Sequence, residues 1–142
     1  MTMKRMALTV LASSFMAGPV LAHHGDAGRY QDTISQITGT VVALQLVNPH
    51  SIIVLDVKGA DGKTVRWQAE MGGAASLARN FGWNRSTLKP GDKITLTGRK
   101  IKSGAPYFNL TEKARIVRAD TGEELFRSAN YEDPGPKVSA NN

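Results

Sequence analysis

The chain has 142 residues, with 18 Lys and Arg against 12 Asp and Glu and no cysteine. Without cysteine, the chain can have no disulfide, thiolate metal site, cysteine nucleophile or lipid-accepting cysteine. The basic residues are interspersed with acidic ones, which predicts a solvated surface and argues against a nucleic-acid partner. This length suits one domain with one core.

The first 22 residues have the parts of a cleavable bacterial signal peptide. Lys4 and Arg5 form its basic start, residues 6–16 its apolar stretch, and Val20-Leu21-Ala22 its cleavage site. The apolar stretch is shorter than the ~20 residues that a membrane-spanning helix needs. We therefore expect cleavage after Ala22 and a mature protein in the periplasm, without a transmembrane anchor.

Residues 38–71 predict three strands. Residues 38–47 are apolar on both faces, which predicts a strand buried on both sides. Residues 51–57 predict the second strand, and the glycines and aspartate of residues 58–62 predict a turn after it. Residues 64–71 alternate between apolar and polar side chains, so we expect a half-exposed third strand. Its apolar face consists of Val65, Trp67, Ala69 and Met71.

A short helix and two more strands follow. Residues 74–81 have apolar side chains at helical spacing, and Gly82 before an apolar residue predicts the end of the helix. Residues 88–92 contain proline and glycine in the order that a type II turn requires, and residues 93–99 then predict the fourth strand. Residues 107–117 predict the fifth strand, with a bulge in its middle.

The order of these elements predicts a mainly β protein: a small five-stranded, OB-like barrel with one short helix, in the order β-β-β-α-β-β. The same alternation of side chains would also fit an open meander or a sandwich. We assign residues 1–22 to the signal peptide, residues 23–127 to the barrel domain and residues 128–142 to a flexible C-terminal tail. The tail is rich in polar residues, Pro and Gly, which bury too little apolar surface to order it.

All three histidines lie in two places. His23 and His24 would begin the mature chain, and His50 lies in Asn48-Pro49-His50-Ser51, between the first two predicted strands. An N-terminal histidine offers its amine and a ring nitrogen, and one more imidazole makes a three-nitrogen site that suits Cu(II). His23, His24 and His50 are therefore the candidate metal ligands, with copper as the candidate metal and no other cofactor.

Each of these residues also has an ordinary structural interpretation. His23 and His24 equally fit a flexible chain end, and His50 fits a loop in which histidine bonds to the backbone. Glu70 and Met71 offer further ligand atoms, but Met71 shares the apolar face of its strand and fits the core better.

The aromatic residues fit either a core or a stacking surface. Trp67, Phe81 and Trp83 fit the core better. Tyr107 and Phe108 point to opposite faces of their strand, so we expect one of the two to be exposed. Such a residue could stack on a ligand, but it identifies none.

No catalytic constellation stands out in the sequence. The pairing of His50 with Ser51 is weak, because adjacent residues on a strand point to opposite faces, and there is no nucleophile elbow or phosphate loop. We therefore expect a non-enzymatic protein. A copper oxygenase is a third interpretation, which would need an open coordination position and a reductant.

Motifs spread over most of the mature chain are shared with one bacterial family. They are Ala22-His23-His24, Gly39-Thr40-Val41-Val42, Asn48-Pro49-His50-Ser51, Trp67 with Glu70, Gly82-Trp83, and residues 88–92 followed by Gly98. On these residues the chain resembles the exported family known as domain of unknown function 6152, although Gly25 stands where that family tends to have serine. The resemblance implies an exported, barrel-like domain and assigns no activity.

Two functions of different classes fit these observations. The first is a periplasmic binding protein without enzymatic activity, which binds copper through His23 and His50. The second is a metal-free envelope module that holds a partner protein or small ligand in a barrel groove. A metal site depends on the histidines, whereas a groove depends on exposed strand residues such as Arg66 and Tyr107.

Overall fold

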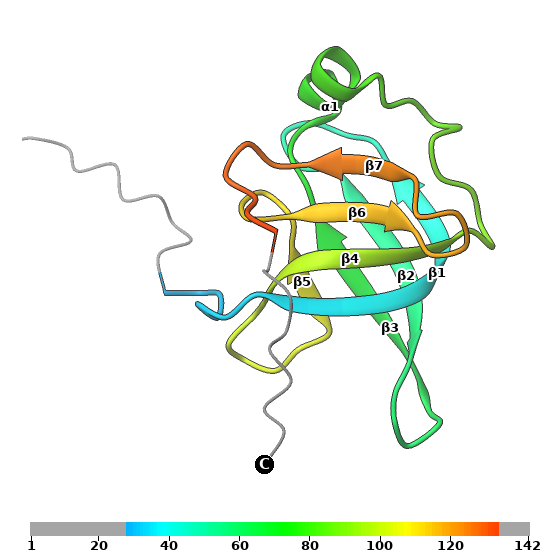
Figure 1. The fold of residues 1–142 in the computed structure, drawn as a ribbon, viewed down its shortest axis with the longest axis vertical. Coiled ribbons are helices and arrows are strands. Elements are labelled where there is room, and N and C mark those ends of the chain that lie inside the picture. Colours follow the sequence, from blue (N-terminus) through cyan, green and yellow to red (C-terminus); the bar gives the residue numbers. More distant parts are fainter. Residues whose placement is uncertain (1–27, 134–142) are drawn as a thin grey trace, which may run out of the picture.

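The computed structural model describes residues 28–133. The predicted signal peptide, His23, His24 and residues 134–142 lie outside the described residues. The described part contains seven strands and one helix (Figure 1). They are β1 (Ser35–Gln45), β2 (Ile52–Lys58), β3 (Thr64–Glu70), α1 (Ala74–Phe81), β4 (Lys93–Lys100), β5 (Tyr107–Asn109), β6 (Arg115–Arg118) and β7 (Glu124–Arg127).

Five of the strands close into a barrel. β1 pairs with both β2 and β4, β2 pairs with β3, and β5 joins β3 to β4. The β3–β5 pair is parallel and the others are antiparallel. This confirms the predicted mainly β fold with a closed five-stranded barrel and one short helix. Closure pairs the strand edges that an open meander would leave exposed.

The core fills the barrel and continues under α1, which lies at the end of the barrel opposite the β2–β3 turn (Figure 1). Met71 and Trp83 are buried in this core, as predicted. Gly82 ends the helix with φ of 69°, and its N–H donates to Ala78 O. The N–H of Trp83 donates to Leu77 O (3.2 Å), so the predicted glycine stop is confirmed.

The first strand is not buried on both sides, contrary to the prediction. Its inward side chains before the irregularity include Ile37 and Val41, which are buried. The pairing with β2 shifts between Val41 and Ala43, which marks a bulge. A bulge reverses which residues face inward, and beyond it the partly buried Leu44 and Leu46 pack against the core. The strand is therefore half-buried, and its residues look apolar on both faces because the bulge changes which of them point inward.

The predicted fifth strand over residues 107–117 is wrong, because two strands and a loop occupy this segment. Asn109 Oδ1 accepts hydrogen bonds from the N–H and the hydroxyl of Thr111 (3.1 and 2.9 Å), and this Asx turn ends β5. Lys113 then adopts φ of 48° before β6 begins. β6 pairs with β4 outside the barrel closure, and β7, which was not predicted, pairs with β6.

Two further expectations differ from the structure. Phe81 is 42% exposed and lies against the ring of Phe126, with 4.8 Å between ring centroids, although it was expected in the core. The predicted tail begins at Ser128, but Ser128 is buried and its hydroxyl accepts a hydrogen bond from Ala114 N–H (2.8 Å). Asn130 likewise accepts from Lys113 N–H (2.7 Å), so residues just beyond 127 pack on the domain.

Candidate functional site

The loop that carries His50 packs against the start of α1. Asn48 Oδ1 accepts a hydrogen bond from Ala75 N–H (3.2 Å), and Val47 O accepts one from Ala74 N–H (3.0 Å). The first turn of a helix leaves N–H groups without partners inside the helix. The loop therefore supplies acceptors that the helix needs, and the helix in turn holds the loop.

Gly73 allows the loop to come this close. A Cβ atom at position 73 would lie 2.7 Å from Asn48 Oδ1 and 2.9 Å from Pro49 O, whereas a Cβ at Gly72 would meet nothing within 4 Å. Ser51 N–H donates to Gly72 O (3.2 Å), which ties the other end of the loop to the same segment. Both ends of the His50 loop are thus held by residues 72–75.

His50, Glu70 and Tyr107 form a row of contacting side chains. The Nδ1 atom of His50 lies 3.0 Å from Glu70 Oε1, and the hydroxyl of Tyr107 donates to Glu70 Oε2 in a short hydrogen bond. Glu70 ends β3 and Tyr107 begins β5, so strands of the barrel position both side chains. The His50 side chain is 55% exposed and that of Glu70 only 13%. The row therefore leads from a half-buried carboxylate out to an accessible imidazole.

The environment keeps the Tyr107 hydroxyl protonated. Burial raises the pKa of Tyr107 well above its usual range, and the hydrogen bond to the Glu70 carboxylate raises it further. A protonated phenol donates its proton to an acceptor, and a carboxylate can only accept. Tyr107 thus holds Glu70 Oε2 and leaves Oε1 directed to His50.

The N-terminal arm, residues 28–31, lies beside the other end of this row. The Arg29 guanidinium carbon lies 5.8 Å from the centroid of the Tyr107 ring. Gln31 N–H donates to Lys100 O (2.8 Å), and Lys102 N–H donates to Arg29 O (3.0 Å). These backbone hydrogen bonds hold the arm against the end of β4.

Two cavities open near the candidate site. The first has a volume of about 230 Å³ and is lined by Arg66, Gln68, Ala105, Pro106 and Tyr107. Of these residues, Arg66 donates two hydrogen bonds to Asp56 (2.9 and 3.0 Å), and it holds the pKa of Asp56 below its usual range.

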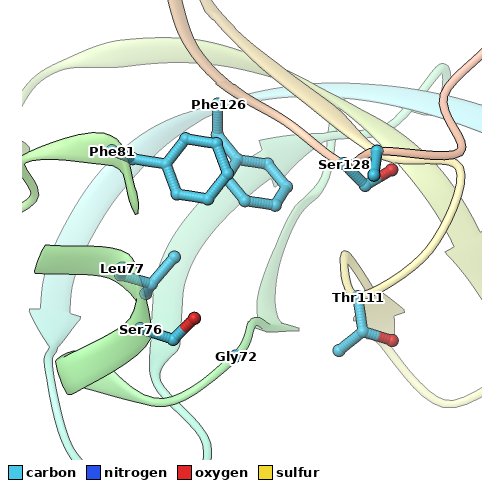
Figure 2. Close-up of a pocket in the computed structure, with 8 residues that line it drawn as sticks. Gly72, Ser76, Leu77, Phe81, Thr111, Phe126 and Ser128 are labelled. Atoms are coloured by element: carbon cyan, nitrogen blue, oxygen red, sulfur yellow. The ribbon is translucent and has the colours of Figure 1, made fainter. Parts of the chain in front are cut away.

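The second cavity, of about 210 Å³, lies between α1 and the segment after β7. Figure 2 shows Leu77, Phe81 and Phe126 on one side of it and Thr111 and Ser128 across from them. The hydroxyls of Thr111 and Ser128 already make hydrogen bonds within the protein, so the apolar wall is the main feature of this cavity.

The structure describes one of the three predicted metal ligands, His50. His23 and His24 lie outside the described residues. Among residues 28–133, no three or more His, Asp or Glu side chains lie together in a way that could hold a metal ion, and no helix there is long and apolar enough to cross a bilayer. From the sequence, Glu70 was expected only as a source of further ligand atoms and Tyr107 only as an exposed aromatic residue, and a contact of either with His50 was not predicted.

Comparison with known proteins identifies one family. Residues 10–107 match the model of a family described as a family of unknown function (DUF6152), which confirms the resemblance expected from the motifs. The matched stretch contains all three histidines and Glu70, and it ends at Tyr107. No curated protein is significantly similar to the chain.

Proposed function

The chain belongs to the family of unknown function DUF6152, and we propose that it is an exported, non-enzymatic binding protein that holds Cu(II) with His50 and the histidine at its mature N-terminus. The observation that carries this proposal is the pair formed by His50 and Glu70. Histidines that bind metals almost always direct their other ring nitrogen to a carboxylate, a backbone carbonyl or water, which orients the ring and raises its basicity. Nδ1 of His50 lies 3.0 Å from the Glu70 carboxylate, while more than half of the His50 side chain is exposed.

The chemistry of the donor set favours copper. Nδ1 of His50 faces Glu70, so Nε2 is the ring nitrogen that a solvent ion can reach. Cleavage after Ala22 would make His23 the first residue, and its amine and ring nitrogen would add two more donors. Nitrogen donors of this kind form the tetragonal sites that Cu(II) prefers. His24 follows directly and remains a candidate for a further donor.

The N-terminal arm, which begins at Gly28, and His50 lie at the two ends of one row of contacting side chains. Arg29 contacts Tyr107, which contacts Glu70, which contacts His50. The six residues from His23 to Gly28 cover ~20 Å when they are extended. A segment of this length can run back along a row of four contacting side chains. The two parts of the proposed site are therefore within reach of each other in one molecule.

Cu(II) titration of three forms of the protein tests this proposal. The first begins at His23, the second carries one additional residue before His23, and the third carries His50→Ala. The proposal predicts tight one-to-one binding by the first form. It predicts a large loss of affinity in the other two forms. The additional residue moves the terminal amine away from His23, and His50→Ala removes the imidazole. Equal, weak binding by all three forms would refute it.

The cavity beside Tyr107 supports the second candidate, a metal-free binding module. Its lining combines a guanidinium, a carboxamide, a tyrosine and the apolar side chains of Ala105 and Pro106, which suit a small polar ligand or a peptide segment. Under this alternative, Arg66→Ala would reduce ligand or partner binding and His50→Ala would not. The copper site predicts the reverse order of effects for Cu(II) binding.

A further inference from the structure

We propose that Glu70 and Tyr107 are positioning residues of the copper site and that they make Nε2, not Nδ1, the atom of His50 that binds the metal. This inference rests on the proposed function. It assigns an atom and an orienting network to the site, which the function alone does not specify.

The contact with Glu70 favours one tautomer of His50. The Tyr107 hydroxyl donates to Glu70 Oε2, and Nδ1 of His50 lies 3.0 Å from Glu70 Oε1 as an ion-pair contact. A carboxylate has no proton to donate, and a bare lone pair on Nδ1 would be repelled at this distance, so a neutral ring carries its hydrogen on Nδ1. Nε2 then carries the lone pair, and it belongs to a side chain that is 55% exposed. The nitrogen that can bind a metal is thus the one that does not face Glu70.

The network is anchored in the barrel and not in the loop alone. Glu70 O accepts the N–H of Leu110 (2.8 Å), and Glu70 lies opposite Ile52 in the β2–β3 register. Tyr107 lies in the parallel β3–β5 pair, opposite Gln68. Side chains on strands hold a geometry better than side chains on loops. His50 lies in a loop, and its contact with Glu70 therefore fixes the imidazole relative to two strands of the barrel.

The experiment uses the processed protein, beginning at His23, with Cu(II) as the probe. Glu70→Ala removes the acceptor, Glu70→Gln keeps a neutral acceptor, and Tyr107→Phe removes the donor to Glu70. Loss of such an orienting partner typically lowers metal affinity ~10–100-fold. We expect a loss of this size in Glu70→Ala, partial recovery in Glu70→Gln and a smaller loss in Tyr107→Phe. Glu112→Gln and Tyr131→Phe serve as matched controls, because neither contacts this row.

Electron paramagnetic resonance separates positioning from a purely structural role. We expect Glu70→Ala to change the nitrogen coupling from His50, and the controls to leave the spectrum unchanged. Wild-type affinity and spectrum in all Glu70 and Tyr107 variants, with His50→Ala still abolishing binding, would overturn this inference and leave the proposed function standing. An equal loss in Glu70→Gln and Glu70→Ala, with a spectrum that has lost an oxygen donor, would also overturn it by making Glu70 a direct ligand.

Discussion

At position 73 the backbone lies closer to the His50 loop than any side chain would allow. Gly73 has φ of −65° and ψ of 151°, a conformation open to every residue, so the need for glycine there is steric. The neighbouring Gly72 has open space around its Cβ position. Of these two glycines, only Gly73 has neighbours so close that a larger residue would clash with them.

Gly73→Ala should destabilise the protein and displace His50. The added methyl group must push Asn48 and Pro49 away, since it would lie 2.7 and 2.9 Å from their oxygens. We expect a loss of ~2 kcal/mol in the free energy of unfolding and weaker Cu(II) binding. Urea unfolding and Cu(II) titration measure the two effects. Gly72→Ala is the control, and the same loss in both variants would show that this contact does not matter.

Asp92 should contribute to stability at neutral pH and not in acid. Its carboxylate accepts the N–H of Lys89 (3.0 Å) and a hydrogen bond from Arg118 (3.1 Å), and these contacts lower its pKa. A lowered folded-state pKa gives stability that is complete above pH ~4 and is lost as the pH falls through the folded value.

Asp92→Asn should therefore be less stable than the wild type at pH 7, and the difference should shrink as the solution becomes acidic. Urea unfolding at a series of pH values measures this. The exposed Asp32→Asn is the charge-matched control. A difference that stayed constant from neutral to acidic pH would contradict the assigned role of the carboxylate.

Part of the candidate site could be predicted from the sequence. The turn between the second and third strands sets an antiparallel register that is symmetric about it, and this register places Glu70 opposite Ile52, close to His50. The pair could thus be found by counting outward from the turn. Tyr107 could not, because it joins through a parallel pair whose register no local turn determines.

At the scale of elements, Trp83 joins the end of α1 to the outermost strand. Its indole Nε1–H donates to Leu125 O in β7 (2.9 Å), and the side chain is 3% exposed. β7 pairs only with β6 among the described strands, and the register of this pair shifts at Leu125. The indole donates to the carbonyl of this residue and links β7 to the barrel core.

Trp83→Phe should loosen β7 more than the barrel. The change removes the donor to Leu125 O, at a cost of ~1 kcal/mol, and leaves space in the core that adds to the loss. Hydrogen exchange should become faster in β6 and β7 than in β1 to β4. Trp67→Phe, at a partly buried position in β3, should not show this pattern. Uniform acceleration across all strands in both variants would argue against the link.

The sequence pattern located β1 to β4 well, because each of these strands has seven residues or more, although it misjudged the burial of β1. It failed for β5, β6 and β7, which have only three or four residues each. Such short runs carry little periodic signal. Asn109 ends β5 through its own side chain, a local turn that the apolar residues around it hide. Phe81 was misplaced because helical spacing shows which face is apolar and not how much of that face is covered.

At the scale of the whole molecule, closure of the barrel depends on Gly98. A Cβ atom there would lie 2.4 Å from Asn109 O and 2.9 Å from Phe108 Cε1, where β4 meets β5. Gly98→Ala would therefore separate the strands that complete the barrel. We expect a loss of ~3 kcal/mol or more in the free energy of unfolding, measured by urea unfolding. A loss no larger than that of Gly72→Ala would contradict this view of the closure.

The most direct test of the copper site is a crystal structure of the processed protein grown with one equivalent of Cu(II), with an anomalous difference map at the copper edge. We expect one strong peak within bonding distance of His50 Nε2, with the N-terminal amine and the His23 ring as further ligands. Copper bound elsewhere, or His50 Nε2 facing solvent in copper-loaded crystals, would contradict it.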